Sequence, residues 1–362
     1  MQKEVFSDLL KQAQHKLDRK TKPVGSLGKL ETLAAQLAAI QGSLEPNIDK
    51  KRMLIFAASH GIAAEGVSAY PPEVTGQMVL NFLNGGAAIN VLSRHGKMNL
   101  HVIDVGVDVD LSDSAKEASN FFSRRVTNGT KSFLREPAMT AEECEAALKA
   151  GYEQVQLAHE QQVRLLGIGE MGIGNTTAAA ALFSALLNIH PEEIVGPGTG
   201  LNEAGVRHKA LVIQKALDLH REKSGADPVA WLQHVGGLEI AAMTGVILEA
   251  YRLQMPVVVD GFIATSAAMV ALQIEPAAKQ ICFFGHRSNE KAHRLVLEKL
   301  DANPVLDLEM RLGEGTGAAL AMHLLDAAAK IMCEMATFDT AGVSDSEQDA
   351  NKQARSASEK ND

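Results

Sequence analysis

Residues 163–187 read VRLLGIGEMGIGNTTAAAALFSALL, an apolar run followed by several glycines and an alanine-rich run. The apolar run is typical of a buried strand and the alanine-rich run of a helix, so the stretch predicts a strand–loop–helix unit of an α/β fold. Gly167, Gly169 and Gly172 match the G-x-G-x-x-G pattern of dinucleotide-binding turns. The loop therefore has three candidate roles: it binds a dinucleotide, it binds another phosphate, or it only turns the chain.

Five short apolar runs are spread along the chain, most of them among longer stretches of helical periodicity. They are RMLIFAA from Arg52, LHVIDVGV from Leu100, VRLLGIG from Val163, PVVVDGF from Pro256 and QICFFGH from Gln280. This alternation predicts a Rossmann-like parallel sheet flanked by helices. Each run ends in small or polar residues, and the carboxyl ends of parallel strands share one edge, so we expect a composite site at that edge.

The composition argues against some classes of function. Lys and Arg total 35 against 44 Asp and Glu, and a net charge of −9 disfavours non-specific binding to nucleic acids or anionic membranes. The three cysteines form no C-x-x-C pair, and residues 1–20 contain no continuous apolar segment of the signal-peptide kind. We therefore expect a cytoplasmic protein without disulfides, and the polar residues 340–362 predict a disordered tail.

The dinucleotide interpretation of the glycine loop lacks one part. A Rossmann turn needs an acidic residue about 20 positions later, at the end of a second strand. Glu192 and Glu193 lie near that distance, but in a segment that reads as a helix end and turn. The segment GIGNTT at residues 172–177 does suit an anion, because glycines admit close approach and a helix start offers free N–H groups. A purely structural glycine turn remains the alternative.

Two further glycine-containing loops strengthen the anion interpretation. VGPGTGLNEAGVRHKA precedes a helix that carries Lys209, and GHRSNEKAH places Ser288 after a strand. Together with residues 172–177, these segments can form a phosphate cradle without a basic patch. Glu170 and Glu314 each lie among glycines, a placement in which a carboxylate faces a cleft and can act as a general base.

Other motifs leave alternatives open. VVVDGFIATSA resembles in part the loop of phosphoribosyltransferases that use phosphoribosyl pyrophosphate, but it holds one acid, Asp260, where paired acids are expected. An NAD-binding oxidoreductase and a non-catalytic nucleotide-binding module are the other candidates for the glycine loop. His60 and His286 have no partners at the spacing of zinc ligands, so no metal site is predicted.

Many ordered segments together resemble one family, nicotinate-nucleotide–dimethylbenzimidazole phosphoribosyltransferase. They are KPVGSLGKLE, HGIAAEGVSAYPPEVTGQMVLNFLNGGAAI, GIGEMGIGNTT, GPGTGL, GGLEIAAMTG, VVVDGFIATSAA, GHRSNEKAH and RLGEGTGAAL. The resemblance implies transfer of phosphoribose from nicotinate mononucleotide to 5,6-dimethylbenzimidazole, giving α-ribazole 5′-phosphate and nicotinate, in the synthesis of the lower ligand of cobalamin. It also implies a homodimer, and no cofactor or metal is expected.

The same resemblance implies the domains and the site residues. A large α/β domain would span residues 46–304, and a smaller helical domain would combine residues 1–45 with 305–339. Glu314 would be the general base and Glu170 a second carboxylate. The residues implied for the benzimidazole pocket are Ser68, Tyr70, Gln77, Met310 and Leu312, and those for the phosphate and ribose are Gly172, Gly174, Asn175, Gly198, Lys209 and Ser288. Two positions, Val24 and Ser59, depart from the usual family pattern.

Overall fold

The computed structural model describes residues 3–111, 115, 118–196, 198 and 200–344. The described residues form two compact units, one within residues 48–324 and one that joins those before residue 48 to those after residue 324. Residues 305–324, which the sequence assigned to the smaller domain, belong to the larger unit. Their backbone N–H groups at Gly315 and Ala318 bond to Asp260 at 3.1 and 2.9 Å, which ties them to the sheet.

The larger unit is built on a parallel sheet, and six strands of it lie in the described residues. The strands are β1 (Lys51–Ala58), β2 (Asn99–Gly106), β3 (Phe121–Ser123), β4 (Leu165–Met171), β5 (Val257–Val259) and β6 (Cys282–Phe284). Their order is β3-β2-β1-β4-β5-β6, the Rossmann order, with the direction of winding reversed between β1 and β4. The predicted fold class is therefore confirmed.

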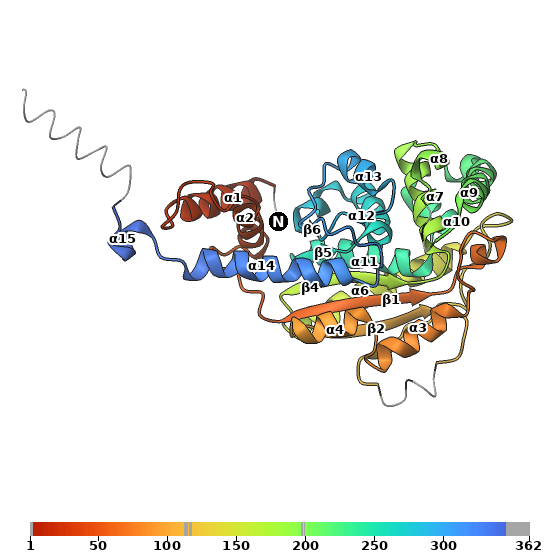
Figure 1. Ribbon diagram of the computed structural model, residues 1–362, viewed down its shortest axis with the longest axis horizontal. Helices are drawn as coiled ribbons and strands as arrows, with labels where there is room; N and C mark the ends of the chain where they lie inside the picture. The colour runs from red at the N-terminus through yellow and green to blue at the C-terminus, as the bar shows by residue number, and fades with distance from the viewer. Residues whose placement is uncertain (1–2, 112–114, 116–117, 197, 199, 345–362) are drawn as a thin grey trace, which may run out of the picture. The chain divides into compact units, whose positions relative to one another are not determined.

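Helices cover both faces of this sheet (Figure 1). In the described residues, the larger unit contains the first half of α14 (Thr316–Glu334) and the helices α3 (Val74–Leu83), α4 (Ala88–His95), α6 (Ala141–Glu160), α7 (Asn175–Leu187), α8 (Pro191–Ile194), α9 (Glu203–Ser224), α10 (Pro228–Val235), α11 (Leu238–Arg252), α12 (Phe262–Ile274) and α13 (His293–Lys299), with 3-10 turns η1 (Gly61–Glu65) and η2 (Pro276–Ile281). All eight residues of β1 are buried, as expected of a central parallel strand covered on both sides.

The smaller unit is helical. It contains α1 (Lys3–Asp18), α2 (Lys29–Gln41), the second half of α14 (Thr316–Glu334) and α15 (Phe338–Ala341). Its loop before α2 is held by a buried ion pair, in which Lys22 Nζ lies 2.8 Å from Glu31 Oε1. Of the predicted tail, residues 340–344 are described and the first of them complete α15, while the rest lies outside the described residues.

Among the described residues, no helix is long and apolar enough to cross a membrane. Of the five strands that the sequence predicted, all are present, and β3 is an addition. The strand β3 is only three residues long and carries no period that distinguishes it from a loop.

Candidate active site

A cavity of about 360 Å³ lies at the carboxyl edge of the sheet, within the larger unit. The ends of β4, β5 and β6 contribute Glu170, Asp260 and His286 to its lining. The turn before α14 adds Glu314, and the segment before α3 adds Tyr70. The composite site expected at this edge therefore forms at the point where the strand order reverses, with residues that follow β1 on one side and residues of β4, β5 and β6 on the other.

The glycines of the quoted stretch have a different role from the one their spacing suggested. Gly167 and Gly169 lie inside strand β4, which stays paired with β1 as far as Met171. A Cβ on Gly169 would stand 2.3 Å from the backbone nitrogen of Gly315, so this glycine admits the turn before α14. The sequence placed Glu170 in a glycine loop, and that placement was wrong, because Glu170 also belongs to β4.

Glu170 is a buried carboxyl group held by two donors. The Nδ2 of Asn175 donates to its Oε2, and the N–H of Glu314 donates to its Oε1 at 3.4 Å. Burial raises the pKa of Glu170 to about 8, and the negative charges of Asp260 and Glu239 add to that rise. Glu170 therefore holds a proton through most of the neutral range.

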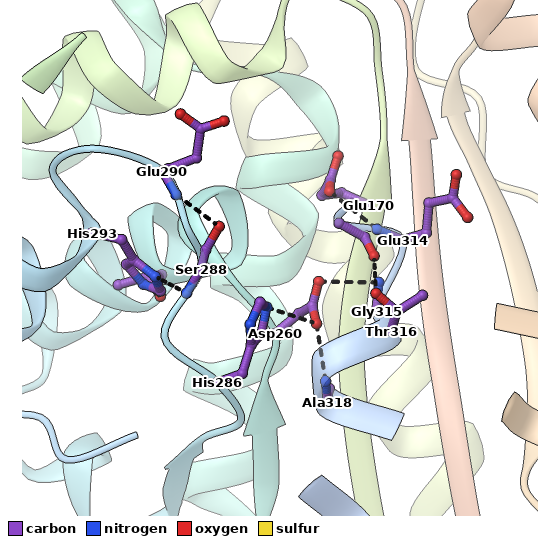
Figure 2. A network of polar contacts seen from close by, with 12 residues as sticks. Glu170, Asp260, His286, Ser288, Glu290, His293, Glu314, Gly315, Thr316 and Ala318 are labelled. Carbon is purple, nitrogen blue, oxygen red and sulfur yellow. Dashed lines mark hydrogen bonds and ion pairs between the residues drawn. The ribbon is translucent and has the colours of Figure 1, made fainter. Parts of the chain in front are cut away.

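Glu314 occupies an unusual turn. Gly313, Glu314 and Gly315 all have positive φ, at 81°, 59° and 75°, which is rare for a residue with a side chain such as Glu314. The residue is 7% exposed, and burial followed by the charge of Asp260 raises the pKa of Glu314 to about 7. A carboxyl group that titrates near neutral pH is suited to proton transfer. In Figure 2 its side chain extends from the turn away from Asp260.

Asp260 holds that turn in place. Its carboxylate accepts from the N–H of Gly315 at 3.1 Å and of Ala318 at 2.9 Å, at the start of α14 (Figure 2). His286 Nε2 lies 3.8 Å from the same carboxylate. Burial raises the pKa of Asp260, whereas His286 and the helix N–H groups oppose that rise. The sequence marked Asp260 only as an isolated acid, because these N–H partners lie more than fifty residues away.

One side of the cavity is formed around the start of α7. Gly174, with φ at 101°, precedes the first residue of that helix, and Lys209 Nζ donates to Thr176 Oγ1 at 2.7 Å. Arg311 Nη1 donates to the carbonyl of Gly198 at 3.3 Å. Burial lowers the pKa of Lys209 to about 8, so the ammonium form persists at neutral pH. A phosphate here would lie at the start of α7 beside Arg311, with the ammonium group of Lys209 behind Thr176.

Most of the predicted site residues meet at this cavity. Those that line it are Ser68, Tyr70, Gly172, Gly174, Asn175, Gly198, Ser288 and Leu312, with Glu170 and Glu314. Lys209 lies behind Thr176 rather than in the lining. Gln77 is exposed on α3 and Met310 bonds through its carbonyl to the N–H of Asn289, and neither lines the cavity.

The structure adds lining residues that the sequence did not single out. Val74 and Met78 of α3 take the apolar side, in the stretch where the sequence pointed to Gln77. Arg311 and Glu290 join the charged side. The helical period of α3 could have indicated Val74 and Met78, since residues four apart share one face of a helix.

The fold and the cavity define a nucleotide-binding α/β enzyme. A phosphoribosyltransferase family profile matches residues 3–343. Two curated relatives are named nicotinate-nucleotide–dimethylbenzimidazole phosphoribosyltransferase. The one from Geobacter sp. strain M21 is 48% identical over 92% of this chain and 95% of its own, and the one from Pelodictyon phaeoclathratiforme is 50% identical over 91% and 92%.

A solved structure agrees with these relatives. The crystal structure of CobT from Thermus thermophilus superposes with a TM-score of 0.88 and 46% identity, over 93% of this chain and 99% of that one. The chain belongs to the nicotinate-nucleotide–dimethylbenzimidazole phosphoribosyltransferase family. The family resemblance that the sequence motifs carried is confirmed.

Proposed function

We propose that this chain transfers the 5-phosphoribosyl group from nicotinate mononucleotide to 5,6-dimethylbenzimidazole, giving α-ribazole 5′-phosphate and nicotinate. The product would serve as the lower-ligand nucleotide of cobalamin. The observation that carries the proposal is Glu314, a buried carboxyl group whose pKa is raised to about 7, in a cavity that also offers an anion site. The printed names of the relatives support the same reaction.

The reaction needs positioning more than strong acid or base. The pyridinium of nicotinate mononucleotide leaves as nicotinate with a neutral ring nitrogen, taking the electrons of the bond to C1′. One benzimidazole nitrogen attacks C1′ from the opposite face, which inverts β to α. Glu314 takes the proton from the second ring nitrogen, so that the product azole is neutral. Held phosphate and held azole make this step effectively unimolecular.

The carboxylates of the cavity have a further use in this reaction. Four acids line it, Glu170, Asp260, Glu290 and Glu314, beside the one lining arginine, Arg311, among the residues that the structure describes. Positive charge develops on the ribose as the pyridinium leaves, and those of the four acids that are ionised stabilise it. Glu170 holds its proton at neutral pH and adds no charge. The start of α7 with Lys209 and Arg311 would hold the phosphate at a separate point of the same cavity.

The direct test uses the whole chain. Incubated with nicotinate mononucleotide and dimethylbenzimidazole, it should give α-ribazole 5′-phosphate, identified by mass. Glu314→Gln should lose most of kcat, on the order of a hundredfold or more, while it still binds the mononucleotide. Binding is measured by calorimetry with the mononucleotide alone. Near-normal turnover by this variant would contradict the assignment of the base.

One rival function has a specific motif behind it. A pyrophosphate-dependent phosphoribosyltransferase would use Asp260 to hold magnesium pyrophosphate, but both oxygens of Asp260 accept N–H groups of the α14 start. We therefore expect turnover with nicotinate mononucleotide after dialysis against EDTA, and none with phosphoribosyl pyrophosphate. Activity that returns only when magnesium and phosphoribosyl pyrophosphate are added would favour the rival.

An NAD-dependent oxidoreductase has less support. The dinucleotide turn follows the first strand of a Rossmann sheet, whereas here Gly167 and Gly169 lie within β4. The proposal also includes a homodimer in the cytoplasm, as the family resemblance implies. Light scattering coupled to size exclusion would show twice the chain mass of 38.6 kDa.

A further inference from the structure

A buried hydrogen-bonded pair, His60 and Glu239, lies behind the anion-binding turn and takes no part in the proposed chemistry. His60 Nε2 is 2.7 Å from Glu239 Oε1, and both side chains have no exposed surface. His60 follows strand β1, and Glu239 lies in the first turn of α11. Neither His60 Nδ1 nor Glu239 Oε2 has another hydrogen-bond partner within the described part of the chain. The two groups therefore depend on each other for hydrogen bonding.

The imidazole is packed against the glycines that line the cavity. A Cβ on Gly172 would stand 3.1 Å from Cδ2 and 3.2 Å from Nε2 of His60. One on Gly174 would stand 3.2 Å from the Cβ of His60. The ring thus lies directly under the turn that leads into α7, and the position of the ring limits the position of the turn.

The other side of the pair is closed in the same manner. A Cβ on Gly237 would stand 2.4 Å from Cε1 of His60 and 2.7 Å from Oε2 of Glu239. The pair is therefore held between the backbone at Gly172 and the backbone at Gly237. This contact gives a use to two motifs that the proposed chemistry does not explain, the glycine pair before Leu238 and the Ser-His-Gly that follows β1.

We propose that His60 and Glu239 form a positioning pair, which fixes the Gly172–Gly174 turn where it meets the phosphoribosyl group of the mononucleotide. The inference rests on the proposed function, since it names a support for the same site. Glu239 orients the ring by its hydrogen bond, and the ring sets the backbone of the turn. Neither residue lines the cavity, so both act through Gly172 and Gly174. Small displacements of such a turn are costly because the reacting atoms must be aligned.

The test compares two substitutions of similar size. Glu239→Gln keeps an oxygen that can accept from the imidazole, whereas Glu239→Leu removes the hydrogen bond and leaves the ring unheld. We expect Glu239→Leu to raise KM for nicotinate mononucleotide about tenfold, with a smaller change in kcat and in KM for dimethylbenzimidazole. Glu239→Gln should restore KM to within about threefold of the parent. The double variant His60→Leu with Glu239→Leu should raise KM by a factor much smaller than the product of the factors for the two single variants.

A matched control separates positioning from mere stability. His234 is another buried histidine, bonded through Nδ1 to Ser224 Oγ at 2.6 Å and absent from the cavity lining. His234→Leu should change the melting temperature and leave both KM values unchanged. Equal KM values for the parent, Glu239→Leu and Glu239→Gln would overturn the inference. If the parent chain forms no α-ribazole phosphate, the proposed function is contradicted. The pair would then be tested by comparing the affinity of the parent and of Glu239→Leu for the mononucleotide alone.

Discussion

The backbone conformation and the burial of Glu314 both cost folding free energy at a residue that we assign to catalysis. A non-glycine residue at φ 59° costs free energy, and placing its carboxyl group in a 7%-exposed position costs more. Glycine would fit the backbone of this turn better, as Gly313 and Gly315 do on either side. The combination of backbone strain and burial at one cavity is typical of a functional residue.

The rate should depend on pH through this residue. Burial raises the pKa of Glu314 to about 7, and only the ionised form accepts a proton. This pKa belongs to the protein without substrates, so we expect kcat/KM for dimethylbenzimidazole to rise as pH increases from about 5.5 to about 8, with half of the rise near the pKa of about 7. The measurement is a pH profile of product formation in buffers of constant ionic strength. A profile with its midpoint near the ordinary glutamate pKa would contradict this assignment.

At the scale of elements, strand β4 and helix α14 meet through glycines. A Cβ on Gly169 would stand 2.3 Å from the backbone nitrogen and 2.4 Å from the Cα of Gly315. One on Gly167 would meet the side chains of Met53 and Met322. These two strand glycines thus let the start of α14 approach the sheet, which is what brings Glu314 to the end of β4.

Gly169→Ala should therefore damage both stability and activity. The methyl group would meet backbone atoms, which cannot turn aside as a side chain can, so we expect a loss of about 1–3 kcal/mol in the free energy of unfolding. We also expect kcat to fall, because the displaced turn carries Glu314. Gly205→Ala, in the first turn of α9, is the control, since the atoms nearest to a Cβ there belong to the side chain of Leu201 and not to backbone. Denaturant unfolding and turnover are measured on both, and equal behaviour would contradict the argument.

The local pattern of the amino-acid sequence was enough to predict the fold class and part of the candidate site. Five strands and the parallel α/β architecture follow from apolar runs and helical periodicity, and the glycine segments indicated where the cavity lies. The roles of Asp260 and Gly169 could not be predicted, because each depends on residues at the start of α14 that are far away in sequence. The position of Glu170 within β4 was missed because glycines in a buried strand resemble a loop.

For the whole molecule, several buried groups favour their uncharged forms. Burial lowers the pKa of His293 to about 3 and of His101 to about 4, so their contribution to stability is present above the ordinary histidine pKa and is lost as pH falls toward those values. Glu170 acts in the opposite direction, since its pKa is raised to about 8. Its folded form holds a proton that the unfolded chain releases, so its contribution is lost as pH rises from 4.5 to about 8.

Glu170→Gln should therefore stabilise the protein increasingly as pH rises. Gln resembles the protonated carboxyl group and has no proton to release on unfolding, so the variant avoids the loss that the parent suffers. The gap in the free energy of unfolding between variant and parent should widen by on the order of 2 kcal/mol from about pH 6 to about pH 8.5.

Glu249→Gln provides the contrast, because Arg252 lowers the pKa of Glu249 and its ion pair is present across this range. That variant should lose a similar amount at both pH values. Denaturant unfolding at the two pH values measures both gaps, and a gap for Glu170→Gln that does not widen would show that Glu170 is already ionised in the folded protein at the lower pH.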